Sequence, residues 1–327
     1  MGLPAVYTVP SGVRWMIQTI LPGWANSTQI EVGEAPTTYE PYNLFIDSLY
    51  YTEPAAPTEV AANKFVKVGD VCTITMGKAR YKLVKQNNWG RALNTWRLYQ
   101  GDIVDDAGAV VHNLWVDSDG EGAIKEVGAA DFIGGFHGDE TYSSVDILIN
   151  GKPIIVANDL DTTFETLDIF VTSKLYHCGT VVEAFDRVKH LSFANHVYTC
   201  SNKFTTLSPF TVDTAALALF NCYKQYQGVD KIFKFTDNYK RTLETVPQGT
   251  SVDGGIYNSA KLDTGTIYGD GFIITIKYLD EKLPEYGGIW TDFGTQNRIK
   301  LYLHTIAAQK TLSVNDIITS MFSVTIE

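Results

Sequence analysis

Leu167-Asp168-Ile169-Phe170-Val171-Thr172-Ser173-Lys174-Leu175-Tyr176-His177 is the stretch that decides the fold class of this chain. Along it, apolar residues alternate with residues that are mostly polar, a period of two that is typical of a β-strand with one buried face. Two further runs of this kind, from 180 to 190 and from 195 to 204, follow after short breaks. The three runs predict successive antiparallel strands of one sheet.

The same signal extends over most of the chain after Val60. Turn signals such as Asn150-Gly151 and Gly269-Asp270-Gly271 separate the runs. Strands do not alternate regularly with helices, which argues against a doubly wound or barrel α/β fold. We therefore predict a large, mainly β module over residues 60–327, an antiparallel β sandwich of jelly-roll or concanavalin-like form. Its further predicted strands are 79–85, 93–100, 145–149, 271–278, 298–304 and 320–326.

One short helix is predicted near residues 213–226. Asp213 is a residue type that caps helix N-termini, and an Ala-rich turn follows it. Leu217, Phe220 and Tyr223 then recur at helical spacing. This helix is the one exception that we expect within the β module.

The N-terminal part differs in composition from the β module. Residues 1–52 hold short β-like runs interrupted by proline and glycine, and prolines recur in the stretch 53–59. We interpret 1–52 as the end of a β-rich leader domain and 53–59 as a Pro-rich linker. A strand domain that closes this early should begin before residue 1, so we expect the chain to be the C-terminal portion of a longer polypeptide.

Composition and charge exclude several function classes. The chain has 327 residues, of which 45% are hydrophobic and 19% charged, which is a globular composition. A net charge of −11 and a pI near 5.0 argue against nucleic-acid binding, because phosphates repel an acidic surface. No apolar stretch approaches the roughly 20 residues that span a bilayer, so no membrane insertion is predicted. The N-terminus carries no export signal.

Cysteine usage and motifs predict neither a metal nor a cofactor. The four cysteines contain no Cys-x-x-Cys pair, which argues against a zinc ribbon or a redox dithiol. So few thiols fit a protein that folds in a reducing cytoplasm. The chain also lacks a Gly-x-Ser-x-Gly elbow, a Walker phosphate loop and a dinucleotide-binding glycine motif.

Gly134-Gly135-Phe136-His137-Gly138-Asp139-Glu140 is the sharpest local concentration of chemical groups. Three interpretations stay open. His137 and Glu140 match the His-x-x-Glu spacing of zinc hydrolases, although those enzymes need an α/β scaffold that this chain does not indicate. Alternatively, His137 acts as a general acid or base beside the Glu140 carboxylate in metal-free sugar chemistry. The third interpretation is a tight turn that its own side chains stabilise.

A band of polar side chains is predicted across the strands between residues 170 and 204. Alternation places Lys174 and Tyr176 on one face of the first strand. It places Glu183, Arg187 and Lys189 together on one face of the second. Neighbouring strands would then present Lys, Tyr, Glu and Arg side by side, the polar and aromatic mixture that binds sugar hydroxyls and C–H faces. A solvated outer face with ordinary ion pairs is the alternative.

Aromatic residues complete the predicted site. Trp290 follows Tyr286-Gly287-Gly288-Ile289, which has the composition of a loop, so we predict that its ring is exposed. Tyr176 is a candidate proton acceptor if the substrate is an acidic sugar. The predicted saccharide-binding residues are Lys174, Glu183, Arg187, Lys189 and Trp290, and the predicted catalytic residues are His137, Glu140 and Tyr176.

One N-terminal stretch resembles a known family. Gln29-Ile30-Glu31-Val32-Gly33-Glu34-Ala35-Pro36-Thr37-Thr38-Tyr39-Glu40-Pro41-Tyr42 is similar to a phrase common in phage tail-fibre and minor tail proteins, Ile-Glu-x-Gly followed by small residues and Tyr-Glu-Pro-Tyr. In those proteins the phrase ends a carbohydrate-binding-like domain upstream of a receptor-binding or depolymerase module. The resemblance covers about 14 of the 327 residues.

The resemblance implies a virion protein. On this basis we predict a receptor-binding module in the phage tail that folds in the host cytoplasm and recognises a bacterial cell-surface polysaccharide. Other tail proteins and two further copies of the chain, in a homotrimer, are the implied partners. Two alternatives stay open: a polysaccharide depolymerase, either lyase or glycoside hydrolase, that acts on host capsule or exopolysaccharide, and a purely structural tail component.

Overall fold

The computed structural model divides the chain into two compact units, Met1–Ala56 and Pro57–Glu327. The predicted leader at 1–52, the linker at 53–59 and the family resemblance at 29–42 lie outside the residues that the structure describes. The described residues belong to the second unit and are 62–87, 93–116, 123–133, 140–237, 242–243, 264–280, 286–292, 298–306 and 309–327.

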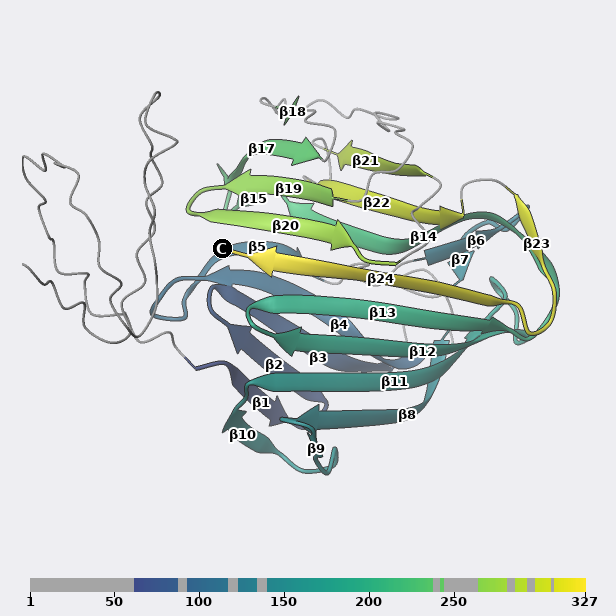
Figure 1. Cartoon of the computed structure of the whole chain (residues 1–327), viewed down its shortest axis with the longest axis horizontal. Helices are drawn as coiled ribbons and strands as arrows, with labels where there is room; N and C mark the ends of the chain where they lie inside the picture. Colours follow the sequence, from purple (N-terminus) through teal and green to yellow (C-terminus); the bar gives the residue numbers. More distant parts are fainter. Residues whose placement is uncertain are drawn as a thin grey trace, which may run out of the picture. The chain divides into compact units, whose positions relative to one another are not determined.

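Every element of regular secondary structure in these ranges is a β-strand, which confirms the prediction of a mainly β module (Figure 1). The first thirteen strands are β1 (Lys64–Val68), β2 (Val71–Met76), β3 (Ala79–Asn87), β4 (Leu93–Val104), β5 (Val110–Val116), β6 (Ala123–Glu126), β7 (Phe132–Ile133), β8 (Glu140–Ile149), β9 (Lys152–Pro153), β10 (Leu160–Thr163), β11 (Thr166–Tyr176), β12 (Glu183–Ala194) and β13 (Val197–Thr206). The others are β14 (Phe210–Tyr223), β15 (Gln225–Tyr226), β16 (Val229–Asp230), β17 (Ile232–Asp237), β18 (Thr242–Leu243), β19 (Thr264–Gly269), β20 (Phe272–Tyr278), β21 (Tyr286–Asp292), β22 (Arg298–Ile306), β23 (Lys310–Leu312) and β24 (Ile317–Ile326).

Sixteen of the described strands form one large sheet. Its order is β10-β1-β2-β3-β4-β8-β11-β12-β13-β24-β20-β19-β17-β18, with β5 on β4 and β9 on β8. Strands β4 and β8 are parallel and pair at two positions, Leu93 with Glu140 and Asn94 with Thr141. The other described neighbours in this sheet are antiparallel. The short parallel pairing therefore joins an N-terminal block, β1 to β5, to the block of long strands from β8 to β24.

A cluster of aromatic rings packs the two blocks face to face. The ring of Tyr81 on β3 lies 5.6 Å from that of Phe193 on β12 and 5.4 Å from that of Tyr198 on β13, centroid to centroid. Trp115 on β5 lies 6.0 Å from Tyr81 and 5.6 Å from Phe220 on β14. All five rings are buried. Figure 1 shows β3 and β4 behind β12 and β13, so the fold is sandwich-like, as predicted.

A second sheet of six strands has the order β21-β22-β14-β6-β7, with β23 on β14. Its strand β14 occupies most of the segment predicted as a helix at 213–226, so that prediction is wrong. Every residue from Leu217 to Cys222 is buried, which means that side chains on both faces of β14 are covered. A strand covered on both faces loses its alternation, and a short apolar run then resembles a helix. The predicted cap, Asp213, instead accepts a hydrogen bond from Gln309 at 3.4 Å.

His112 on β5 makes the stability of this fold depend on pH. Its ring is buried and stacks on that of Phe272 at 5.3 Å, and its Nε2 lies 3.8 Å from Sγ of Cys222. Burial lowers the pKa of His112 from 6.5 to about 4, because a buried imidazolium loses its hydration. Between these two pH values the unfolded chain binds a proton that the folded chain does not. The contribution of His112 to stability is therefore complete above pH 6.5 and is lost as the pH falls towards 4.

We expect this titration to reduce the free energy of unfolding by roughly 2–3 kcal/mol between pH 7 and pH 4, at 1.36 kcal/mol per unit of pKa difference. Urea unfolding followed by tryptophan fluorescence at several pH values measures it. The His112→Gln variant removes the titrating group, so its stability should vary less with pH in this range. An equally steep pH dependence in the variant would contradict the assignment.

Candidate functional site

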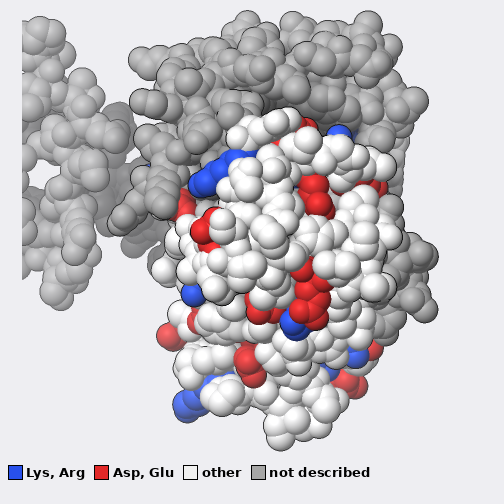
Figure 2. Space-filling model, turned by 90° about the vertical axis from the view of Figure 1, so that its right-hand side faces the viewer, with Lys and Arg blue, Asp and Glu red and all other residues white. Residues whose placement is uncertain are grey.

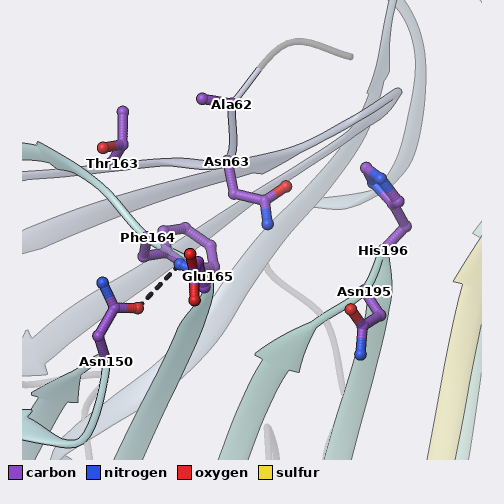
Figure 3. A pocket seen from close by; sticks show the side chains of 8 residues that line it. All are labelled: Ala62, Asn63, Asn150, Thr163, Phe164, Glu165, Asn195 and His196. Atoms are coloured by element: carbon purple, nitrogen blue, oxygen red, sulfur yellow. Dashed lines mark hydrogen bonds between the residues drawn. The ribbon is translucent and has the colours of Figure 1, made fainter.

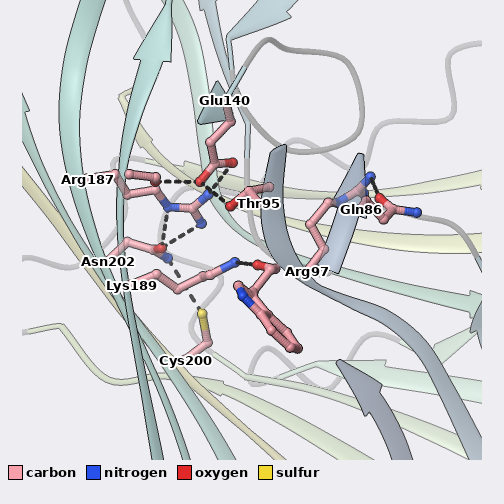
Figure 4. Close-up of polar contacts among 10 residues, drawn as sticks. Gln86, Thr95, Arg97, Glu140, Arg187, Lys189, Cys200 and Asn202 are labelled. Atoms are coloured by element: carbon pink, nitrogen blue, oxygen red, sulfur yellow. Dashed lines mark hydrogen bonds and ion pairs between the residues drawn. The ribbon is translucent and has the colours of Figure 1, made fainter. Parts of the chain in front are cut away.

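Glu140, a predicted catalytic residue, is fully buried at the start of β8. Its Oε1 accepts hydrogen bonds from Ser173 Oγ at 2.5 Å and from Thr95 Oγ1 at 3.4 Å. Its Oε2 lies 3.4 Å from Nη1 of Arg187, which is also buried (Figure 4). Because internal partners hold both oxygens, this carboxylate neutralises a cation inside the sandwich and is not presented to solvent.

Arg187 and Lys189 share one face of β12, as predicted, but it is the inner face. Arg187 Nε and Nη2 donate hydrogen bonds to Asn202 Oδ1 at 3.0 and 2.7 Å. Lys189 Nζ donates to the carbonyl oxygen of Trp96 at 2.7 Å (Figure 4). Both side chains are buried, so they do not lie on a surface that a polysaccharide contacts.

Lys174 and Glu183 lie on the opposite, outer face of the same strands. Lys174 Nζ is 2.6 Å from Oε2 of Glu183 and 3.7 Å from Oδ1 of Asp186, and the hydrogen bond to Glu183 raises the pKa of Lys174. A β-bulge where Tyr176 pairs with Glu183 shifts the register by one residue. The shift moves Glu183 to the face opposite Arg187. The predicted band is therefore divided between the two faces of the sheet.

The remaining predicted residues lie elsewhere. Tyr176, at the end of β11, is half-buried. His137 lies outside the described residues. Trp290 belongs to β21 and pairs with Lys300, so the loop predicted at 286–289 is instead a strand.

A first hollow in the described surface lies among strand turns (Figure 3). Its volume is about 670 Å³. Asn150 Oδ1 accepts hydrogen bonds from the backbone N–H groups of Glu165 and Thr166 at 2.8 and 3.0 Å, so the adjoining turn already uses this amide. The ring of Phe164 is buried and presents little apolar surface to a ligand. The lining residues are Ala62, Asn63, Asn150, Thr163, Phe164, Glu165, Asn195 and His196.

A second hollow, which we call the outer groove, lies across β11, β12, β13 and β24. Its volume is about 750 Å³. The strand register places Phe170 beside His190, His190 beside Ser201, and Ser201 beside Met321. The groove is lined by Phe170, Val188, His190, Ser201, Asn202, Lys203, Leu279, Asp280, Thr319, Ser320 and Met321.

A stacked pair of rings forms part of this groove. The rings of Phe170 and His190 lie 4.2 Å apart and within 9° of parallel. His190 Nε2 is 2.8 Å from Oδ1 of Asp168, which fixes the orientation of the imidazole. When the ring is neutral, Nε2 donates to this carboxylate and Nδ1 is left as an acceptor. The stack therefore combines a flat apolar surface with an oriented polar nitrogen.

Charged and apolar groups lie side by side along the groove. A second row of paired residues, Val188, Lys203 and Thr319, runs next to the first. Thr319 Oγ1 donates to Asp280 Oδ2 at 2.9 Å, and Lys203 is exposed. Val188 and Met321 are 42% and 39% exposed, although both are apolar. Exposed apolar surface beside a carboxylate and an ammonium group is suited to a ligand with both C–H faces and hydroxyls.

None of the residues that line this groove was predicted from the sequence as a site residue. The alternation along 183–190 favoured Arg187 and Lys189, whereas the groove is lined by Val188 and His190 on the opposite face of β12. The groove could have been found from outward-facing residues two apart on three strands, which together mix polar and apolar types: Val188 and His190, Ser201 and Lys203, and Thr319 and Met321.

Two kinds of feature are absent from the described part of the chain. No group of three or more His, Cys, Asp or Glu residues in that part is arranged to hold a metal ion. Among the same residues, no helix has the length and apolar character needed to cross a bilayer.

No protein-family model matches the chain, and no curated protein matches it in sequence. Similar solved structures include a family 36 glycoside hydrolase, an α-galactosidase from Geobacillus stearothermophilus (TM-score 0.48, 8% identity, 80% of this chain and 41% of that one). They also include the galactosidase domain of an α-galactosidase-sucrose kinase (TM-score 0.46, 11% identity, 80% of this chain and 41% of that one). A third is a galactose mutarotase-like protein from Lactobacillus casei (TM-score 0.39, 11% identity, 79% of this chain and 100% of that one). The chain spans about two fifths of the two galactosidase chains. All three TM-scores are below 0.5.

Proposed function

We propose that this chain is the receptor-binding module of a phage tail fibre and that its outer groove binds a bacterial cell-surface polysaccharide. The stack of Phe170 and His190 in an exposed groove is the observation that supports saccharide binding. The phage assignment rests on the resemblance at residues 29–42. A jelly-roll or concanavalin-like topology, assembly with other tail proteins, a homotrimeric state and a place in the virion tail belong to the same proposal.

The chemistry of the groove explains how a sugar would be held. A pyranose ring has an apolar C–H face, which the ring stack and the exposed side chains of Val188 and Met321 would cover. Asp280 and Lys203 would bind hydroxyl groups at the edge of the ring. The volume of about 750 Å³ lies within the range of roughly 300–1,000 Å³ that is usual for ligand sites.

A polysaccharide depolymerase is the second candidate. The pair of His190 and Asp168 favours it, because a histidine oriented by a carboxylate is a common general base. The catalytic group proposed from sequence has weaker support, since Glu140 is fully buried. In a depolymerase of this kind, His190 would move the proton.

Binding to an array of bacterial surface glycans tests the proposal. We expect His190→Ala to weaken binding of the best glycan at least about 10-fold, equivalent to about 1.4 kcal/mol, because the substitution removes both the ring surface and the nitrogen acceptor. Lys174→Ala is the matched control, since Lys174 lies on the same outer face but does not line the groove. The control should bind as the wild type does.

Absence of glycan binding by correctly folded protein, or equal binding by His190→Ala, would contradict the proposal. Incubation with the bound polysaccharide separates the two candidates. New reducing ends indicate hydrolysis, and products that absorb in the ultraviolet indicate a lyase. Binding without either product supports a receptor-binding module.

A further inference from the structure

A serine, a histidine and a glutamate meet at one end of the sandwich, away from the residues that line the outer groove. Ser208 lies in the connection between β13 and β14, His177 follows β11, and Glu126 ends β6. Strand β6 pairs with β14 at Glu126 and Val212, and this pairing holds the carboxylate close to the start of β14. Figure 2 views this end of the molecule, where acidic and basic side chains form small patches on a mostly uncharged surface.

The three side chains form a continuous hydrogen-bonded series. His177 Nε2 lies 2.5 Å from Ser208 Oγ, and His177 Nδ1 lies 2.9 Å from Glu126 Oε2. A carboxylate only accepts, so the short contact with Glu126 requires a proton on Nδ1. In the neutral ring, Nε2 is then the acceptor that faces the serine hydroxyl. This order of nucleophile, base and orienting carboxylate is the geometry of an activated serine.

Local contacts fix each member of the series. The backbone N–H of Cys178 donates to Glu126 Oε1 at 3.4 Å, and the ring of Phe210 packs edge-on against His177 at 5.1 Å. Ser208 precedes a proline, which restricts its backbone to extended conformations. Its hydroxyl also donates to the Glu183 carbonyl at 2.8 Å. Rotation about the Cβ–Oγ bond alone redirects this proton to His177 and leaves Oγ in place.

The series is partly open to solvent. The side chains of His177 and Glu126 are 14% and 16% exposed, and Ser208 is half-buried. The side-chain carboxylates of Glu183 and Asp186 are exposed. Glu183 is adjacent to the series, because its backbone carbonyl oxygen accepts the hydrogen bond from Ser208. Lys174 is the ion-pair partner of both carboxylates, so one net negative charge is left in this group, and it disfavours an anionic substrate. An uncharged carboxylic ester is the class of substrate that this charge distribution suits.

We propose that Ser208, His177 and Glu126 form a serine esterase site. Ser208 Oγ attacks the ester carbonyl carbon, its proton passes to His177 Nε2, and the C–O bond to the alcohol breaks as His177 returns the proton to the leaving oxygen. Water then attacks the acyl-serine, gives a proton to His177 and releases the carboxylic acid as Ser208 regains its proton. The sum is ester plus water giving alcohol plus acid. Glu126 acts as a positioning residue that stabilises the imidazolium.

A fluorophosphonate probe tests the site directly in the full chain. The probe should form an oxygen–phosphorus bond at Ser208 with release of fluoride, and peptide mass spectrometry of the wild-type protein identifies the labelled residue. Ser208→Ala and His177→Gln should abolish labelling. Ser143→Ala is the matched control, because the Ser143 hydroxyl also donates to a backbone carbonyl, that of Thr172 at 3.2 Å. The control should be labelled at the wild-type rate.

Hydrolysis of p-nitrophenyl acetate provides a second measurement. Glu126→Gln should lower kcat at least about 10-fold with little change in KM, and Glu126→Asp should recover part of the loss. Labelling at other serines, or none above the level of Ser208→Ala, would overturn the proposal. Because wild-type protein suffices for the mapping, an unfolded variant does not obscure the result. Glycan binding through the outer groove is measured separately, so either proposal can fail alone.

Discussion

Glu140→Gln is expected to reduce the free energy of unfolding by about 3–5 kcal/mol. Glutamine keeps the shape of the side chain but removes the negative charge that lies 3.4 Å from the Arg187 guanidinium. The Arg187 side chain is only 1% exposed, so its charge would lose the compensation that Glu140 provides. Urea unfolding of the purified variant at pH 7 measures the change.

Glu183→Gln is the matched control for this experiment. It makes the same substitution in an ion pair whose partners are about 40% exposed, where water screens the charges. We expect a change below about 1 kcal/mol. Equal effects of the two substitutions would contradict the expectation that the buried pair contributes more to stability than the exposed one.

Phe193→Ala is expected to destabilise the fold by about 3–5 kcal/mol. The Phe193 ring is fully buried between the blocks, 5.1 Å from the ring of Tyr198 and 5.6 Å from that of Tyr81. Truncation removes its buried apolar surface and leaves a cavity that β-sheets on either side cannot readily close. Thermal and urea unfolding should both show the lower free energy of unfolding.

Phe233→Ala makes the same truncation at an exposed position. Phe233 on β17 is 52% exposed, so little buried surface is lost, and we expect a change within about 0.5 kcal/mol. A loss at Phe193 no larger than the loss at Phe233 would show that the aromatic cluster does not hold the two blocks together.

The strands were predictable where one face is buried and the other is not. The runs predicted at 167–177, 180–190 and 195–204 correspond to β11, β12 and β13, with ends displaced by one to four residues. Alternation alone does not mark a turn, and the hairpin at Asn195 and His196 depends on positive φ angles of 51° and 61°. The helix prediction at 213–226 failed because burial of both faces of β14 removed the period of two.

The site was less predictable, because it depends on register and on distant partners. Sequence patterns place charged side chains on the solvent face, yet Arg187 is buried because Glu140, 47 residues earlier, compensates its charge. The bulge at Tyr176, which turns the Glu183 side chain outward, cannot be predicted from the local sequence pattern. The contacts of His177 with Glu126 and Ser208 span 51 and 31 residues, so no short sequence motif predicts them.

The position of β24 has a consequence for how the protein is made. Strand β24 lies between β13 and β20, and Thr205 pairs with Ile317, 112 residues further along the chain. At ribosomal rates of about 5–20 residues per second, roughly 6–22 s pass between the synthesis of β13 and that of β24, its partner strand. During that interval the unpaired amide and carbonyl groups of β13 face other nascent chains on the same polysome. Synthesis therefore includes a stage at which the growing polypeptide is especially open to aggregation.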